Sequence, residues 1–277
     1  MSLAAGIDIG SITAKAAILR DGAFLGTKVI FTGYNAEGAG RRVFEELLEE
    51  LGLAPAEVGR IVATGYGRKS VAIADKVVTE IMCHAAGARF LDPSVRSLID
   101  IGGQDSKAVV MDGNGKVVNF AMNDKCAAGT GRFLEVMARA LEADLDEFGE
   151  LSLKAERPAK ISSLCTVFAE SEVISLISKG ETRENIIAGI HEAIASRVAA
   201  MADRIGLAAP VMMTGGVARN IGVVRALEKA IGMPVVVSPH AQVAGAIGAA
   251  SLAQEFKVHE DLKGKTALVA GAGRSNP

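Results

Sequence analysis

The sequence contains one phrase twice, as "IDIGSITAKAAIL" at residues 7–19 and as "IDIGGQDSKAVVM" at residues 99–111. In each copy an apolar run leads to an Asp, then to a Gly-containing polar turn, then to a second apolar run that begins with Lys-Ala. Such runs are typical of β-strands. Glycine lets backbone N–H groups approach an anion, hydroxyls such as those of Ser11 and Thr13 add donors, and an Asp at a strand end can hold hydrated magnesium. The repeat therefore predicts two lobes of similar plan with one polyphosphate between them.

A single Asp that precedes a turn glycine usually does no more than end a strand and cap a turn, so this structural role is the alternative for each copy. The second copy, together with "TGG" at residues 214–216, favours nucleotide binding. The chain contains no P-loop motif, and each turn is followed by a strand rather than a helix.

The surrounding sequence predicts an α/β fold. Residues 4–12 and 15–31 form strands with a turn at "RDG", and residues 97–122 repeat this plan. The stretch "AGRRVFEELLEELG" at residues 39–52 has a helical apolar spacing that ends at a glycine. Further on, the pattern predicts a buried helix at 185–206, a strand ending in a Gly-Gly turn at 209–220, and a tightly packed small-residue helix at 241–256.

Composition excludes several classes of protein. Of the 277 residues, 49% are apolar, 22% are charged and 4% are aromatic, which indicates a globular protein with an aliphatic core. The net charge of -2 without a basic block argues against a nucleic acid partner. No apolar run is long enough to cross a membrane, and the start of the chain lacks a signal sequence, so we expect no membrane association and a cytoplasmic location. An odd number of cysteines fits a reducing compartment without a disulfide framework.

Two of the three cysteines occupy similar settings. Cys126 precedes a predicted helix whose core face includes Phe133, Leu134, Met137 and Leu141, and Cys165 lies between a predicted short strand and a helix carrying Val167, Val173 and Ile177. Both thiols are then at helix starts, where the helix dipole favours negative charge. An ordinary buried role is the alternative for each. A 4Fe-4S cluster normally needs four thiolates, which two identical chains could supply. Cys83 is expected in a helical core, since its neighbour His84 points to a different face.

The segments "GIDIGSITAKAAIL", "LIDIGGQDSKAVVM" and "VMMTGGVARN" resemble the phosphate and adenosine motifs of the superfamily of actin, Hsp70 and sugar kinases. The resemblance implies two ribonuclease H-like lobes with ATP in the interlobe cleft. It also implies site residues. Asp8 and Asp100 would organise magnesium and act in catalysis with Gln104. The first phosphate loop would consist of Ser11, Ile12, Thr13, Ala14 and Lys15. The second would consist of Gly102, Gly103 and Gln104. Gly215 and Gly216 would face the ribose and the α-phosphate.

From about residue 5 to residue 254 the chain more closely resembles the family of 2-hydroxyacyl-CoA dehydratase activators and benzoyl-CoA reductase ATPase subunits. The segments that carry this resemblance are "NDKCAAGTGRF", "CTVFAESEVIS", "TGGVARN", "ATGYGR" and "SPHAQVAGAIGAA". It implies a homodimer in which Cys126 and Cys165 of both chains hold one oxygen-sensitive 4Fe-4S cluster, with Gln242 near the nucleotide. An electron from ferredoxin or flavodoxin would pass to a 2-hydroxyacyl-CoA dehydratase with hydrolysis of ATP to ADP.

We expect a first lobe at residues 1–97, completed by the helix near 244–256, and a second at 98–243 that carries the cluster cysteines. Residues 257–277 form an extension to which we assign no function. Lys15 and Lys107 are weaker candidates for the site, because a lysine at a strand start is often simply solvated. The alternatives are an ATPase subunit of a benzoyl-CoA-type reductase, an activator of another iron-sulfur acceptor, and, from different classes, a sugar or acid kinase or an actin-like filament protein.

Overall fold

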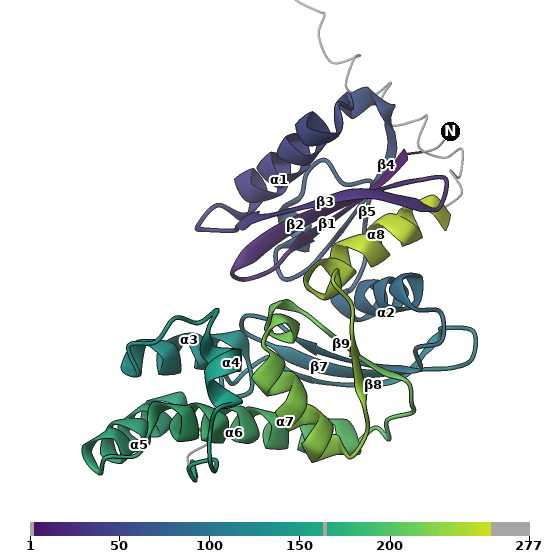
Figure 1. Ribbon diagram of the computed structural model, residues 1–277. Coiled ribbons are helices and arrows are strands. Elements are labelled where there is room, and N and C mark those ends of the chain that lie inside the picture. Colours follow the sequence, from purple (N-terminus) through teal and green to yellow (C-terminus); the bar gives the residue numbers. More distant parts are fainter. Residues whose placement is uncertain (1–2, 163–164, 256–277) are drawn as a thin grey trace, which may run out of the picture.

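Two five-stranded sheets, one in each half of the molecule, organise residues 3–162 and 165–255, which are the residues that this computed structural model describes (Figure 1). The first sheet has the order β3-β2-β1-β4-β5, with bounds Leu3–Ile9 (β1), Thr13–Arg20 (β2), Ala23–Phe31 (β3), Val58–Thr64 (β4) and Lys76–Val77 (β5). The second has the order β10-β9-β6-β7-β8, with bounds Ser97–Ile101 (β6), Ser106–Met111 (β7), Val117–Asn123 (β8), Val211–Thr214 (β9) and Val235–Val237 (β10). The C-terminal extension lies outside the described residues.

The repeated phrase forms the same hairpin in both sheets. β1 pairs antiparallel with β2 and parallel with β4, and β6 pairs antiparallel with β7 and parallel with β9. The register sets Asp8 opposite Lys15 and Asp100 opposite Lys107. Because paired residues in an antiparallel ladder project on the same face, each Asp shares a face with its Lys. The predicted α/β class with two lobes of similar plan is confirmed.

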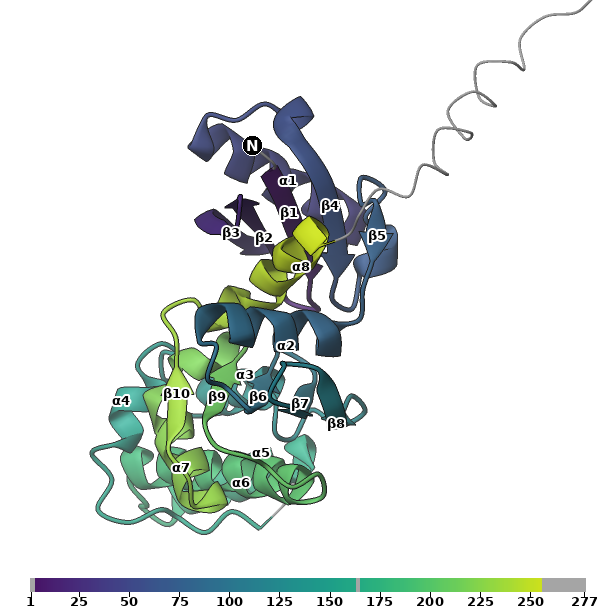
Figure 2. The ribbon, with the colours of Figure 1, turned by 90° about the vertical axis from the view of Figure 1, so that its right-hand side faces the viewer.

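Helices cover both faces of each sheet, which gives a layered molecule (Figures 1 and 2). α1 packs on the outer face of the first sheet, α8 and α2 lie between the two sheets, and α6 with α7 covers the outer face of the second. Their bounds are Ala36–Leu51 (α1), Glu80–Leu91 (α2), Arg183–Asp203 (α6), Ile221–Ile231 (α7) and Ala244–Glu255 (α8). None of the helices in the described residues is long and apolar enough to cross a membrane.

The predicted helices agree with the observed ones to within a few residues. α1 begins after Asn35, whose side chain accepts a hydrogen bond from the N–H of Gly38, and it ends at Gly52 in the left-handed conformation. α6 begins after Thr182, whose side chain accepts a hydrogen bond from the N–H of Asn185. The helix expected at 241–256 starts with a 3₁₀ turn at Ala241–Val243 before α8. Further 3₁₀ turns are Pro55–Glu57, Arg68–Ser70 and Gly216–Arg219.

α2 and α8 cross at very short range where the two lobes meet. A Cβ on Gly248 would lie 1.8 Å from the carbonyl oxygen of Cys83, and one on Gly87 would lie 1.9 Å from that of Ala244. Only glycine allows backbones to approach so closely. α2 also packs Ala85 and Ala88 against the second sheet, although the sequence places it in the first lobe. This crossing therefore joins the two sheets.

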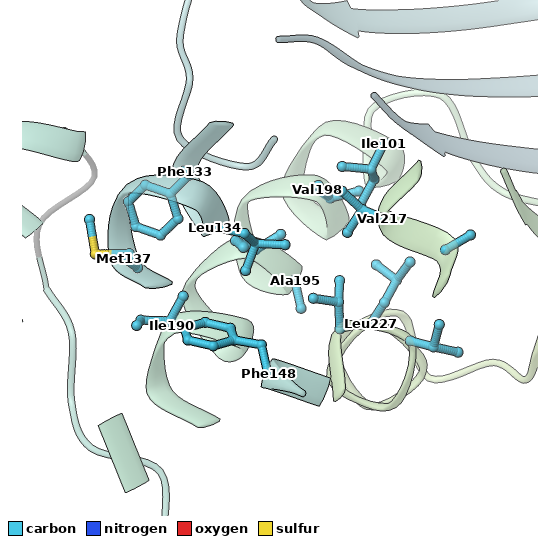
Figure 3. Packing of buried hydrophobic residues seen from close by; sticks show 14 of the residues in the cluster. Ile101, Phe133, Leu134, Met137, Phe148, Ile190, Ala195, Val198, Val217 and Leu227 are labelled. Carbon is cyan, nitrogen blue, oxygen red and sulfur yellow. The ribbon is translucent and has the colours of Figure 1, made fainter. Parts of the chain in front are cut away.

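The helices that follow the two cysteines lie together on one side of the second lobe (Figure 1). They are α3 (Gly131–Ala140) and α5 (Thr166–Ser178), with the short α4 (Phe148–Ser152) beside them. Figure 3 shows how apolar side chains of α3 and α4 meet those of α6. The predicted core face of α3 is confirmed because Phe133, Leu134, Met137 and Leu141 are all buried.

The predicted setting of Cys165 needs two corrections. Residues 161 and 162 form no strand, and the rest of the expected strand, residues 163–164, lies outside the described residues. Of the three apolar residues predicted for the core of this helix, Val173 is buried, whereas Val167 and Ile177 are 67% and 44% exposed. The spacing of apolar residues was helical as expected, but much of this apolar surface faces outward in the single chain.

Candidate functional site

The two turns of the repeated phrase face one cavity of about 360 Å³ between the lobes. Asp8, Gly10 and Ser11 line it from the first lobe, and Asp100, Gly102, Gly103, Gln104 and Asp105 line it from the second. Both carboxylates that the sequence assigned to magnesium are therefore on one cavity. The cavity also collects side chains that were not singled out as site residues, namely Tyr66, Arg68, Glu80, His84, Lys107, Met122 and Asp124.

Asp100 is almost fully buried and is held ionised by its neighbours. Its Oδ1 accepts a hydrogen bond of 2.9 Å from the hydroxyl of Thr214 and lies 3.2 Å from Nδ1 of His84, and its Oδ2 lies 3.3 Å from Nζ of Lys107. Burial acts to raise the pKa of Asp100, but the charges of His84 and Lys107 and these hydrogen bonds lower it to about 2. The carboxylate is thus fixed in position and negatively charged at neutral pH.

Lys107 is the largest surprise in the site, because it is 1% exposed rather than solvated. Its Nζ lies 2.7 Å from Asp105, 2.9 Å from Glu80 and 3.3 Å from Asp100. Burial acts to lower the pKa of Lys107, but the three carboxylates raise it, so the side chain stays charged. The alternative of a simply solvated lysine does not hold for Lys107, because its position in the repeated hairpin directs it into the cleft. Lys15, its counterpart, lies 3.3 Å from Asp8 and has a side chain that is 13% exposed.

A chain of ion pairs crosses from one lobe to the other through α2. Arg68, in the first lobe, donates to the carbonyl oxygen of Gly65 at 2.9 Å and lies 3.6 Å from Oε1 of Glu80. Oε2 of Glu80 contacts Lys107 of the second lobe. Since Lys107 also contacts Asp100 and Asp105 at the second lobe's phosphate loop, these ion pairs link the first lobe to that loop.

His84 occupies the space between the two repeated aspartates. Its Nδ1 faces Asp100 and Thr214, whereas a Cβ on Gly245 of α8 would meet both Nε2 of His84, at 2.8 Å, and Oδ2 of Asp8, at 3.0 Å. Glycine at the start of α8 is thus what lets this helix pass beside both side chains.

A second cavity of about 360 Å³ adjoins the first and shares Gly102 and Gly103 with it. It is lined by Ile12, Thr13 and Phe31 from the first lobe and by further residues around α3, the Gly216–Arg219 turn and α8, which are Gly131, Leu134, Glu135, Leu145, Asp146, Gly216, Val217, Arg219, Asn220 and Gln242. Its apolar side chains and polar rim suit a flat aromatic ring, and its shared glycines suit the adjoining phosphates. Together the two cavities have the form of a nucleotide cleft.

The remaining candidate residues fall around this cleft in different ways. Gly215 has a φ of 89°, and a Cβ there would lie 2.3 Å from the carbonyl oxygen of Ile101, so glycine is required to join β9 to the cleft. Gly216 lines the cleft directly. The Ala14 side chain is buried in the core of the first lobe, which leaves only its backbone for a ligand.

The loop of Cys126 is tied to the second phosphate loop through α3. The backbone N–H groups of Gly131 and Arg132 donate to the carbonyl oxygens of Gly102 and Gly103 at 2.9 and 2.8 Å. Within the loop, the side chain of Asn123 donates to the carbonyl oxygen of Cys126 at 2.9 Å. α3 starts five residues after Cys126, so this thiol is not at the helix end that the sequence predicted, but two hydrogen bonds connect that helix to the nucleotide cleft.

The three cysteines differ in accessibility, as their predicted roles require. Cys126 is half-buried, and Cys165 is exposed and is the residue that caps α5. Cys83 is buried in α2 as predicted, and burial raises the pKa of its thiol to about 12. No group of three or more metal-ligating side chains occurs in the described residues.

The candidate ligands can be compared with magnesium and the 4Fe-4S cluster, the two cofactors that the sequence resemblance implies. Magnesium keeps most of its waters and needs few carboxylates, so Asp8 and Asp100 on one cavity fit it. A 4Fe-4S cluster needs four thiolates, and one chain offers two accessible thiols. The residues therefore fit half of a cluster site.

Sequence reasoning overlooked Arg68, Glu80, His84 and Asp105. The segment "ATGYGR" carried the family resemblance without a role for its arginine, and His84 entered only as the neighbour of Cys83. The only available signal was that Asp105 and Lys107 follow the second Asp within the repeated phrase. Glu80 and His84 come from a helix that no local pattern directs toward the cleft.

The two-lobed fold with this cleft defines an ATPase of the actin-like class. A ROK family glucokinase from Streptomyces griseus shares the fold alone, with a TM-score of 0.58 and 16% identity over 92% of this chain and 100% of that one. Within this class, the chain belongs to the BadF/BadG/BcrA/BcrD ATPase family, whose model matches residues 5–253.

Close relatives carry more specific names. The chain is 52% identical to the activator of lactoyl-CoA dehydratase of Anaerotignum propionicum, over 90% of this chain and 96% of that protein. Component A of the (R)-2-hydroxyglutaryl-CoA dehydratase of Acidaminococcus fermentans superposes with a TM-score of 0.89 and 47% identity, over 92% and 98% of the two chains. The activator of the 2-hydroxyisocaproyl-CoA dehydratase of Clostridium difficile, solved with bound ADPNP, gives a TM-score of 0.88 and 43% identity, over 99% and 100%.

Proposed function

We propose that the protein is an ATP-dependent electron-transfer activator of a 2-hydroxyacyl-CoA dehydratase. The observation that carries this proposal is the connection between a two-lobed nucleotide cleft and an accessible cysteine loop, made by α3. A sugar or acid kinase has no use for two accessible thiols beside its cleft. The names of the three close relatives, all activators or components of such dehydratases, support the same assignment.

In this proposal the cleft binds ATP with its phosphates between the two repeated turns. The backbone around Ser11–Lys15 and Gly102–Gln104 would bind the phosphates, Gly216 and Gln242 the adenosine side, and Asp8 and Asp100 magnesium. Gln104, which is exposed at the cavity, would orient the attacking water. When bound, magnesium would neutralise charge on the phosphates, and a 4Fe-4S cluster would carry single electrons.

The chain's own contacts offer a route from nucleotide to thiols. Loss of the terminal phosphate would change the charge beside Gly103, whose carbonyl oxygen accepts from α3. Movement of α3 would shift the Cys126 loop and α5, because α3 packs against α5. ATP and ADP can shift this equilibrium only by their different affinities for the two arrangements.

The proposal includes a homodimer that shares one cluster. Each chain would contribute Cys126 and Cys165, so that two chains supply the four thiolates. Val167, Phe168 and Ile174 of α5 are 67%, 67% and 53% exposed in the single chain, next to Cys165. Such an apolar surface beside a ligand suits a contact between two copies. Ferredoxin or flavodoxin would reduce the dimer.

The decisive experiment is activation of a dehydratase. Protein purified under argon should be brown. With a ferredoxin and a reductant, it should restore activity to inactive 2-hydroxyacyl-CoA dehydratases in the presence of ATP but not of ADP or a non-hydrolysable analogue. A colourless protein that transfers phosphate to sugars or carboxylic acids would reject the proposal. A brown protein that is active only with a benzoyl-CoA-type reductase or another iron-sulfur acceptor would show that its partner is not a 2-hydroxyacyl-CoA dehydratase.

A further inference from the structure

A third cavity, of about 630 Å³, opens toward the other face of the second sheet and meets the nucleotide cleft at the β8 edge, where Met122 and Asp124 line both. It is bounded by the end of β8, the segment leading to Cys126, and α6, which lies below the sheet edge formed by β8 (Figure 2). Ser106 lines it, whereas the next residue, Lys107, lines the nucleotide cleft. This follows from the alternation of side chains along a strand.

The cavity is positively charged. Lys125, Arg197 and Arg204 line it, against the single carboxylate of Asp124. Within the part of the chain that the structure describes, none of these three cations lies within ion-pair distance of a carboxylate. Unpaired cations around a concave surface attract and steer an anionic partner.

These cations are also attached to the Cys126 loop. Lys125 immediately precedes Cys126, and the carbonyl oxygen of Cys126 accepts from Asn123, which lines the cavity. A Cβ on Gly129 would lie 3.2 Å from Cδ of Arg197, so the arginine stem packs directly on the same loop. A partner bound here would therefore contact the segment that holds one of the two accessible thiols.

We propose that this cationic cavity, defined by Lys125, Arg197 and Arg204, is the docking surface for a small acidic protein that donates the electron. The inference rests on the proposed function. Lys125 and Arg204 are exposed, so their charges lie at the rim, where they can meet carboxylates carried on a protein surface rather than enclose a small anion. In the transfer the docked protein is oxidised by one electron, which passes to the group held by the cysteines, with no bond or proton changed.

The test measures binding of a recombinant acidic bacterial ferredoxin to the full chain under argon, at low and high salt, by biolayer interferometry. The triple variant Lys125→Gln, Arg197→Gln, Arg204→Gln should bind about tenfold more weakly than the wild type and lose most of its salt dependence. A matched triple variant of exposed cations elsewhere, Arg41→Gln, Lys69→Gln, Lys154→Gln, should bind within about twofold of the wild type. Arg197→Lys should retain binding, because it keeps the charge.

Ligand controls separate charge from other contacts. Ferredoxin whose carboxylates have been amidated should bind the wild type weakly, and basic cytochrome c should not bind. Equal binding of ferredoxin to the wild type and the cavity variant would overturn the proposal. So would displacement of ferredoxin by inorganic phosphate at constant ionic strength, which would assign the cavity to a small anion. Dithionite should reduce the wild type and the variant equally, and failure of the wild type to be reduced by dithionite would contradict the proposed function instead.

Discussion

Lys107 shows how strongly one buried side chain can organise the cleft. Its ammonium group contacts the carboxylates of Asp100, Asp105 and Glu80. Because the side chain is buried, water cannot replace these partners. Removing one member of a buried ion network leaves the others as uncompensated charges, which costs far more than the net contribution of an exposed pair. Lys15, with one partner and more exposure, is the natural comparison.

We therefore expect Lys107→Met to lower the free energy of unfolding by about 3–5 kcal/mol. Lys15→Met should lower it by less than Lys107→Met does, because it leaves one carboxylate, that of Asp8, without its cation, whereas Lys107→Met leaves three. Urea unfolding followed by circular dichroism measures both. Equal losses in the two variants, or a loss in Lys107→Met as small as that of an exposed pair, would show that the network is not strongly coupled.

His191 gives the fold a dependence on pH. It is buried, its Nε2 lies 3.3 Å from the side-chain nitrogen of Asn220, and its Nδ1 has no partner among the described residues. Burial lowers its pKa to about 3. The unfolded chain therefore binds more protons than the folded chain between pH 6.5 and 3, so stability falls as the pH falls through that window.

From pH 7 to pH 5 this residue should remove on the order of 2 kcal/mol from the free energy of unfolding. His191→Phe keeps a ring against Phe148 and cannot titrate, so its stability should change less over the same interval. Parallel urea titrations at the two pH values provide the comparison. If the two proteins lose the same stability, His191 is not the group responsible.

The crossing of α2 and α8 is the element pair that joins the lobes. Any side chain on Gly248 would overlap the carbonyl oxygen of Cys83. Gly248→Ala should therefore cost about 1–3 kcal/mol of stability and should change ATP turnover, because it forces apart the helices that carry Glu80, His84 and Gly245. Gly113→Ala is the control, since a Cβ there meets nothing within 4 Å. Thermal unfolding and ATPase rates measured on both variants test this, and an unaffected Gly248→Ala would contradict the close crossing.

α3 is the element that should report the nucleotide to the cysteines. We expect an iron chelator to bleach the protein at different rates with no nucleotide, with ADP and with ATP, in an absorbance time course under argon. Asp100→Asn should remove most ATP turnover and reduce the difference between the nucleotides, whereas the exposed Asp203→Asn should behave as the wild type. Identical rates in all three nucleotide states would leave the hydrogen bonds from α3 to the phosphate loop without a coupling role.

Among the helices and strands, the sequence predicted correctly the features that depend on residues close together in the chain. The repeated hairpins, α1 with its glycine end, and the core face of α3 follow from periodicity and turn residues. The exposure of Val167 and Ile177 on α5 could not be predicted in this way, because helical spacing shows that apolar residues share one face of the helix but not what covers that face. Lys107 was misjudged for a related reason, since its partners Glu80 and Asp105 meet it only after the lobes pack.

Taken as a complete molecule, the protein is one half of the assembly that we propose. Its nucleotide cleft is formed within a single chain by both lobes, whereas its accessible thiols number two where a 4Fe-4S cluster needs four. The uncovered apolar side chains of α5 lie next to Cys165. Substitution of Cys126 or Cys165 should therefore leave ATP binding in the cleft intact but should abolish binding of the cluster.

The measurement that tests this most directly is iron and acid-labile sulfide per chain, combined with analytical ultracentrifugation under argon. The wild type and Cys83→Ser should form dimers with about four irons per dimer, and Cys126→Ser and Cys165→Ser should hold none while still binding ATP. A wild type with about four irons in each monomer, or a stable cluster in Cys165→Ser, would contradict the account.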